Sequence, residues 1–167
     1  MKKILVLSDS HGRSGKVKKM IAENLDLDGI IYLGDGERDL ETGLSANGFV
    51  KNDTETCERD GHNIFLYQVR GNCDRESIEA VTLIREIAGI KFYITHGFEQ
   101  GVKFGLEKLS YCAEEADCRV ALFGHTHGMH LSELGGVTLF NPGSAANGNY
   151  GMITVDEGNL SFKHCSL

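Results

Sequence analysis

Short apolar runs that each end abruptly in a polar loop constrain the fold of this chain most strongly. At the N-terminus, residues 3–7 are strand formers, residues 15–25 have apolar side chains at helical spacing, and residues 29–33 are a second strand-like run. Ser14 is expected to cap the helix. A strand, a helix and a strand in this spacing imply a right-handed crossover and a parallel pair. The polar loops that follow the two strands therefore lie at the same carboxyl edge of a sheet.

Hairpins dominate the second half of the chain. Residues 51–61 are polar and are expected to form a loop or an exposed hairpin. Further along the chain, a helix is predicted over residues 101–116. The later strands are expected at residues 63–69, 81–87, 90–95, 119–123, 129–134, 137–140, 150–155 and 160–165. This order of elements predicts an α/β protein in which two mixed β-sheets pack face to face with helices outside.

Length, charge and cysteine content limit the class of protein. A chain of 167 residues is expected to form a single domain over residues 1–167. We expect no transmembrane helix, because no run of 18 apolar residues is present. We also expect no signal peptide, because the apolar run that follows Met1-Lys2-Lys3 is short and ends at Ser8-Asp9. Five cysteines without a C-x-x-C pair predict reduced thiols and a cytoplasmic location. The formal net charge of -7 disfavours extended nucleic acid, although bound divalent cations would still attract a small phosphate ester.

Five strand ends carry side chains that can bind metal ions. His125 and His127 are two residues apart, so in an extended backbone they point the same way. The other strand ends supply Asp9, His11, Asp35, Asn72 and His96. A carboxylate can bridge two ions, imidazoles suit transition metals, and an Asn carbonyl is a neutral oxygen donor. This mixture predicts a pair of Mn, Fe or Zn ions.

The order of these residues resembles one family along the whole chain. The motifs are Asp9-x-His11, Gly34-Asp35, Gly71-Asn72-Cys73-Asp74, Thr95-His96-Gly97 and Gly124-His125-Thr126-His127. They resemble the metallophosphoesterase (calcineurin-like) superfamily, and most closely its small single-domain phosphodiesterases of the YfcE type. The resemblance implies a four-layered fold with two sheets between flanking helices. It also implies hydrolysis of small phosphodiesters.

The resemblance further implies how the ligands divide between two ions. Asp9, His11, Asp35 and His127 would hold one ion, and Asp35, Asn72, His96 and His125 would hold the other, with Asp35 as the bridge. Mn is the ion expected first, with Ni, Fe, Zn or Mg as alternatives. Two divalent ions can acidify a bridging water to hydroxide, orient the ester and stabilise the charge that develops during displacement.

Asp35, Asn72, Cys73 and Asp74 are the residues expected to take part in catalysis. Many members of the superfamily have His and Glu where this chain has Cys73 and Asp74, and that His is placed to help the leaving group. Because a protonated thiol is a poor substitute, we expect a preference for activated leaving groups. A buried structural cysteine is the alternative for Cys73, and Asp74 either orients a ligand or caps its own loop.

Two other functions remain compatible with these motifs. A retromer subunit of the family uses the scaffold for protein assembly and has lost part of the ligand set, whereas every motif ligand is present here. A protein phosphatase or nuclease would need recognition domains for which the chain is too short.

The expected partner is a small phosphodiester, without a membrane or extended nucleic acid, and homo-oligomer formation is left open. Arg13 and Arg38 lie near the metal loops and are either phosphate-binding groups or solvated surface residues, so neither is selected as catalytic.

Overall fold

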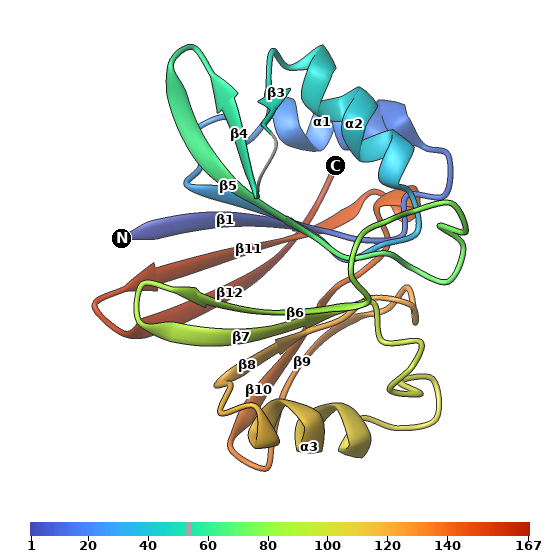
Figure 1. Cartoon of the computed structure of the whole chain (residues 1–167), viewed down its shortest axis with the longest axis vertical. Helices are drawn as coiled ribbons and strands as arrows, with labels where there is room; N and C mark the ends of the chain where they lie inside the picture. The colour runs from blue at the N-terminus through green and yellow to red at the C-terminus, as the bar shows by residue number, and fades with distance from the viewer. Residues whose placement is uncertain (53–54) are drawn as a thin grey trace.

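The structure is a computed structural model, and it describes residues 1–52 and 55–167 (Figure 1). Residues 53–54, within the segment expected to be a loop or hairpin, lie outside the described residues. The elements are, in chain order, β1 (Lys2–Leu7), α1 (Ser14–Ala22), β2 (Gly29–Tyr32), α2 (Glu37–Ala46), β3 (Val50–Lys51), β4 (Thr56–Arg59), β5 (His62–Gln68), β6 (Thr82–Ile87), β7 (Ile90–Thr95), α3 (Glu107–Glu115), β8 (Val120–Leu122), β9 (Met129–Leu134), β10 (Val137–Pro142), the 3-10 turn η1 (Ala145–Asn147), β11 (Asn149–Asp156) and β12 (Asn159–Ser166).

Two mixed sheets form the centre of the molecule, as the sequence predicts. One has the strand order β12-β11-β1-β2-β5-β4-β3 and the other has the order β6-β7-β8-β10-β9. β1 and β2 are parallel, with Leu5 opposite Ile30, and β2 is parallel to β5. β8 lies parallel to both β7 and β10. The predicted parallel pair is therefore confirmed, and the parallel strands of each sheet bring their carboxyl ends to one edge.

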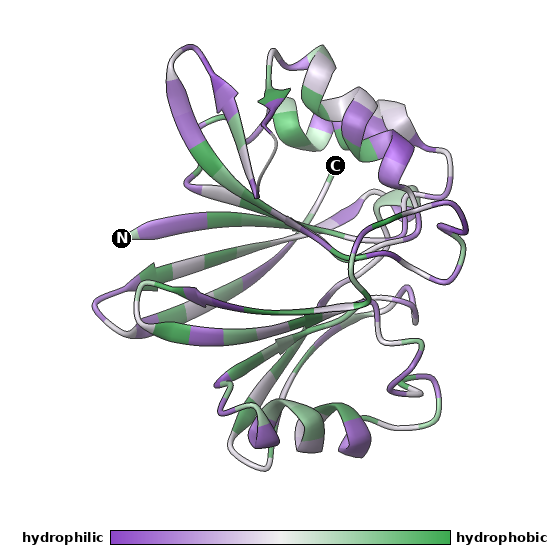
Figure 2. Cartoon of the chain, viewed as in Figure 1, coloured by the Kyte–Doolittle hydropathy of each residue, from purple (hydrophilic) through white to green (hydrophobic). Residues whose placement is uncertain are grey.

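Three apolar clusters separate four layers of structure. The first lies between the helices α1 and α2 and the seven-stranded sheet and includes Leu5 and Met20. The second fills the space between the two sheets and includes Ile4 and Phe92, and the third packs under α3 around Leu109. Apolar segments accordingly run along the inner strands in Figure 2. Because successive residues of β1 face opposite clusters, the strand is buried on both faces and has a continuous apolar sequence.

Two helix starts differ from the sequence prediction. Helix α1 begins at Ser14 itself, and its N-cap, Arg13, makes no side-chain capping hydrogen bond. Helix α3 begins at Glu107, six residues later than predicted, because Gly101 and Gly105 have φ angles of +62° and +143°. Residues 97–106 therefore form a loop beside the strand ends (Figure 1). Within the two described ranges, no helix is long and apolar enough to cross a membrane.

Candidate metal centre

Backbone hydrogen bonds tie the polar loops together at the strand ends. The amide of Asp9 donates to the carbonyl of Gly34 at 2.9 Å, and the amide of His11 donates to the carbonyl of Asp35 at 3.1 Å. In the five-stranded sheet, the amide of Gly124 after β8 donates to the carbonyl of His96 after the neighbouring strand β7 at 3.0 Å. All seven predicted metal ligands belong to these loops or to the neighbouring loop that contains Asn72.

Asp9, His11 and His127 form one cluster of candidate ligands. The Nε2 atoms of His11 and His127 lie 3.1 Å apart, and they lie 3.5 Å and 3.2 Å from Oδ1 of Asp9. The other oxygen of Asp9, Oδ2, accepts hydrogen bonds from the Ser8 hydroxyl and the His125 amide. The protein therefore holds one carboxylate oxygen of Asp9 and leaves the other facing two imidazoles.

Asp35, His96 and His125 form a second cluster. Nε2 of His96 lies 3.3 Å from Oδ2 of Asp35 and 3.0 Å from the side-chain oxygen of Asn72. The other ring nitrogen of His96, Nδ1, lies 2.7 Å from the carbonyl oxygen of Leu33. Because that carbonyl can only accept, it fixes a proton on Nδ1 and leaves Nε2 as the nitrogen that faces the two oxygens and could bind a metal ion.

Asp35 lies between the two clusters. Its Oδ2 atom is 3.8 Å from Nε2 of His11, and its Oδ1 atom accepts a hydrogen bond from the Cys73 amide at 2.8 Å. Burial acts to raise the pKa of Asp35, but the hydrogen bond and charge of His96 outweigh it and lower the pKa to about 2. Burial acts to lower the pKa of His96, and the carboxylates of Asp35 and Asp9 outweigh it, so that this pKa is raised. Asp35 is thus ionised and in contact with both clusters.

Left-handed backbone is concentrated at the candidate ligands. Nine non-glycine residues in the described ranges have positive φ, and five of them are Asp9, His11, Asp35, His125 and His127, with φ between +41° and +65°. Such conformations cost on the order of 1–3 kcal/mol each and persist where the surroundings enforce them. The extended backbone assumed for His125 and His127 is therefore wrong, because β8 ends at Leu122. The left-handed turns direct the two rings into different clusters.

Cys73 and Asp74 occupy different environments. Cys73 is exposed, so the buried structural alternative is wrong; partial burial and the charge of Asp35 raise the pKa of its thiol. Both carboxylate oxygens of Asp74 accept backbone hydrogen bonds. Its Oδ2 binds the amides of Asp35 and Gly71 at 2.7 Å and 2.8 Å, and its Oδ1 binds the amide of Gly36 at 2.9 Å. Asp74 therefore fixes the backbone of the Asp35 loop.

Asn141 and Ser144 support the ligand loops, a role that the sequence analysis did not assign to them. The side-chain amide of Asn141 donates to the carbonyl of Gly124 and to the hydroxyl of Thr126, both at 3.0 Å. The hydroxyl of Ser144 donates to the carbonyl of Asp9 at 2.8 Å. Both residues are fully buried. The Asn-Pro-Gly-Ser sequence that contains the only proline of the chain was the available signal.

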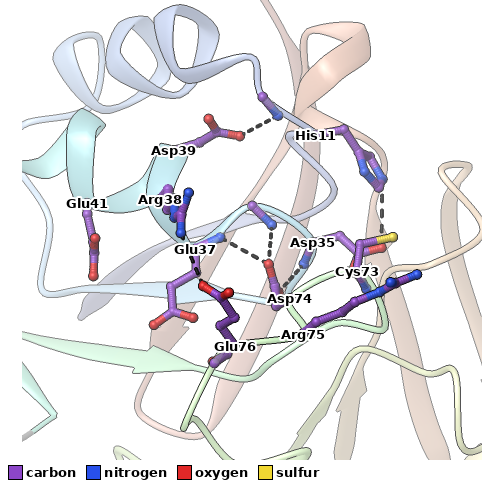
Figure 3. A pocket seen from close by; sticks show the side chains of 13 residues that line it. His11, Asp35, Glu37, Arg38, Asp39, Glu41, Cys73, Asp74, Arg75 and Glu76 are labelled. Atoms are coloured by element: carbon purple, nitrogen blue, oxygen red, sulfur yellow. Dashed lines mark hydrogen bonds and ion pairs between the residues drawn. The ribbon is translucent and has the colours of Figure 1, made fainter.

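Two cavities open beside the clusters. The larger, of about 700 Å³, is lined by His11, Asp35 and Cys73 on one side and by Glu37, Arg38 and Glu76 on the other (Figure 3). Arg38 and Glu76 form an exposed ion pair of 3.3 Å at its margin. The smaller, of about 370 Å³, is lined by residues that include Asn72, His96 and Phe98. Arg75 lines both cavities, and the sequence analysis did not select it.

The residues present fit two divalent cations. Oδ1 of Asp9 is buried and is without a hydrogen-bond partner in the described part of the chain. A buried carboxylate oxygen without a partner costs free energy, whereas a cation beside it would supply the missing interaction. The donor set of carboxylates, imidazoles and one amide oxygen is suited to Mn, Fe, Ni or Zn. The cluster at Asp9 contains three of the four residues that the resemblance assigns to one ion, and the cluster at Asp35 contains three of the four assigned to the other.

Comparisons with known proteins agree on one family. The family model of the calcineurin-like phosphoesterase superfamily domain matches residues 1–158. The Bacillus subtilis protein named "Probable metallophosphoesterase YsnB" is 31% identical over 143 residues, covering 84% of this chain and 73% of that protein. The phosphodiesterase MJ0936 of Methanocaldococcus jannaschii is 28% identical over 165 residues, covering 92% of this chain and 90% of that protein.

Solved structures share the fold. A predicted phosphoesterase from Streptococcus pneumoniae TIGR4 superposes with a TM-score of 0.74 at 24% identity, covering 99% of this chain and 89% of that chain. Wild-type Vps29 from Entamoeba histolytica, complexed with Zn²⁺, superposes with a TM-score of 0.69 at 16% identity, covering 98% of each chain. The two-sheet fold is therefore shared by phosphoesterases and by Vps29.

Proposed function

Because the chain belongs to the calcineurin-like phosphoesterase superfamily, we propose that it is a metal-dependent phosphodiesterase acting on small phosphodiesters at a dinuclear centre. One observation carries the proposal: the buried, unpartnered Oδ1 of Asp9 lies 3.2 Å from His127 and 3.5 Å from His11, while Asp35 joins this cluster to a second one. The name of the archaeal relative, a phosphodiesterase, supports the reaction class.

The residues divide into ligands and groups that hold the ligands. Asp9, His11 and His127 would bind one ion, Asn72, His96 and His125 the other, and Asp35 both. When bound, two divalent ions supply Lewis acidity toward the ester and lower the pKa of water. Asp35 keeps its charge because its pKa is low, and Asp74 holds the backbone on which Asp35 lies. Asp74 is thus proposed as a positioning residue.

The charge of the site selects for small anionic esters. Two dications with Asp9 and Asp35 leave a formal charge of +4 - 2 = +2, which attracts a phosphodiester monoanion. The chain as a whole has a formal charge of -7, so an extended polyanion is repelled away from the centre. All five cysteines are free thiols, in keeping with the reducing cytoplasm that we propose as its location.

A protein-binding scaffold like the retromer subunit remains the alternative. Similarity to Vps29 at 16% identity concerns the fold alone, and that Vps29 structure holds Zn²⁺. Metal binding by itself therefore does not separate an enzyme from a scaffold. The complete set of seven predicted ligands supports chemistry, and turnover is the measurement that decides.

The test compares metal content with turnover. The purified protein is stripped of metal and reloaded with Mn, Ni, Zn or Mg separately, and rates are measured on an activated aryl phosphodiester and on the matching monoester. We expect two ions per chain, faster hydrolysis of the diester, and loss of activity with folding retained in Asp35→Asn. Asp117→Asn, which changes an exposed ion pair with Lys91, is the matched control. Inactivity with every metal, or an active Asp35→Asn variant, would overturn the enzyme proposal.

A further inference from the structure

Phe98 presents an aromatic ring to solvent beside the metal centre. It follows His96 by two residues, and its side chain is 58% exposed. Its ring meets the ring of His125 edge to face, with centroids 5.4 Å apart and planes at 87°. A single exposed aromatic ring is ordinary at a protein surface, so the significant feature is the position of this ring beside His125. Phe98 also lines the cavity of about 370 Å³ that contains Asn72 and His96.

Buried anchors hold the loop that carries Phe98. The carbonyl of Phe98 accepts a hydrogen bond from the Gly101 amide at 3.1 Å. Val102, four positions after Phe98, is buried. Gln100 is also buried, with its side-chain oxygen 3.1 Å from the hydroxyl of Thr95. The ring is thus attached to a fixed backbone, which is what a preformed binding surface needs.

Two guanidinium groups line the same cavity. Arg70 and Arg75 are both exposed, and neither forms an ion pair with any other described residue. Arg75 also borders the larger cavity, so its side chain lies where the two cavities adjoin. Guanidinium groups stack on planar rings and bind phosphate, and an Arg without a carboxylate partner is available for both.

The two cavities differ in what they can hold. The lining of the larger one is mostly charged and includes Glu37, Glu41 and Glu76. None of the described residues that line this cavity is a Phe, Tyr or Trp. The smaller one has the Phe98 ring, the apolar side chain of Val81 and two arginines, and its carboxylates are Asp74, which binds backbone amides, and Glu99. A phosphodiester has two arms, and this asymmetry gives each arm a different environment.

We propose that the cavity beside Phe98 binds a planar aromatic ring on one arm of the phosphodiester, with Phe98 as the stacking surface and Arg75 as the adjacent cation. The substrate class is then an aryl or nucleoside phosphodiester, whose second, polar arm lies in the larger cavity. This inference rests on the proposed phosphodiesterase function. The volume of about 370 Å³ lies within the range of small-molecule sites, and stacking tolerates different rings because every ring has a π face.

The test measures binding of monoesters to the Mn-loaded protein by calorimetry. Adenosine 5′-monophosphate and ribose 5-phosphate differ by the base, while phenyl phosphate and methyl phosphate differ by an aryl ring attached directly to the ester oxygen. In at least one of the two pairs, we expect the aromatic ester to bind about tenfold or more tightly than its non-aromatic partner. The pair that shows the preference identifies whether the ring is a nucleobase or an aryl leaving group.

Variants of Phe98 separate stacking from general effects. Phe98→Ala and Phe98→Leu should remove the preference, because leucine is apolar but not planar, whereas Phe98→Trp should keep it. Phe104→Ala is the matched control, since Phe104 lies on the same loop, is 97% exposed and does not line the cavity. Folding is checked by thermal unfolding of each variant.

Three results would overturn the inference: no measurable binding of any of the four esters, equal affinity within both pairs, or a preference that survives Phe98→Leu. Failure of the proposed function looks different, because it appears as absence of diester turnover with every metal. A ring preference that depends on Phe98 in a protein without turnover would uphold the binding site and reject the hydrolase. Turnover without any ring preference would uphold the hydrolase and reject the binding site for a ring.

Discussion

The carboxylate of Asp74 holds the backbone of Asp35, whose amide nitrogen donates to Oδ2 of Asp74 at 2.7 Å. The amides of Gly71 and Gly36 bind the same carboxylate. In Asp74→Asn, one oxygen becomes an NH₂ group that faces amide donors, so the Asp35 loop loses its support. We expect metal affinity to fall about 10- to 100-fold, as is typical when a group that orients a ligand is removed.

Metal titration calorimetry and the dependence of the rate on Mn concentration check this prediction. The rate should recover at high Mn, because the ligands themselves are intact. Asp117→Asn makes the same chemical change at an exposed ion pair. It should leave both the calorimetric titration and the dependence of the rate on Mn concentration unchanged. Unaltered affinity in Asp74→Asn would mean that Asp74 only caps its own loop.

Gly71 leaves room for Asp35. A Cβ atom at Gly71 would lie 2.0 Å from Oδ1 of Asp35 and 2.5 Å from its backbone nitrogen. Because the backbone cannot yield easily, Gly71→Ala should cost about 1–3 kcal/mol of the free energy of unfolding and weaken metal binding. Denaturant unfolding measures the first effect and calorimetry the second. Gly15→Ala, inside α1 with nothing within 4 Å, should instead be neutral or stabilising by up to about 1 kcal/mol, and equal behaviour of the two variants would contradict the prediction.

The strands and the candidate ligands could be predicted because both depend on local sequence. Strands buried on two faces have apolar sequences, and the residue after the last apolar position is where a loop begins, as at Leu7 and Leu33. The start of α3 could not be predicted in the same way. Residues 101–106 have the apolar spacing of a helix, but Gly101 and Gly105 adopt conformations that the pattern does not encode.

The contacts that hold the ligands are distant in sequence. Ser144 binds the carbonyl of Asp9 from 135 positions away, and Asp74 binds the amide of Asp35 from 39 positions away. No periodicity connects such pairs, because the first depends on how the two sheets pack and the second on the pairing of β2 with β5. The left-handed backbone at His125 and His127 is likewise a result of these tertiary contacts, and sequence reasoning assumed an extended strand end there.

Asn141 supports the loop of His125 and His127 through the Gly124 carbonyl and the Thr126 hydroxyl. Asn141→Ala leaves that buried carbonyl without its partner, which should cost about 1–3 kcal/mol of the free energy of unfolding. Metal affinity should also fall, since both histidines lose their support. Thermal and denaturant unfolding with and without Mn measure both effects. Asn159→Ala, at an exposed hairpin, is the control, and equal stability of the two variants would reject a supporting role for Asn141.

Cys73 occupies the position at which many superfamily members have a His, and its raised pKa keeps the thiol protonated. A protonated thiol is a weak proton donor to a leaving alkoxide. We therefore expect the hydrolysis rate of a series of phosphodiesters to fall steeply as the pKa of the leaving group rises. Cys73→His should flatten this dependence. Faster turnover of an alkyl monoester than of an activated diester would contradict the prediction.

Cys57 makes the stability of the fold sensitive to alkaline pH. This thiol is fully buried in β4, and burial raises its pKa from 9.0 to about 11. Because the pKa is higher in the folded state, the unfolded state loses its proton first. The stabilising contribution is complete below pH 9 and is lost as the pH rises through about 11, with a limit of about 3 kcal/mol for two pKa units.

Cys57→Val removes the titrating group from the same strand position. We expect the free energy of unfolding, measured in urea at pH 8, 9, 10 and 11, to fall less steeply for this variant than for the natural chain. The values at pH 8 give the constant offset that the substitution itself causes, so only the difference in slope is interpreted. Tyrosines and lysines that titrate in this range are common to both proteins and cancel in the comparison. Parallel curves would show that the buried thiol is not linked to unfolding.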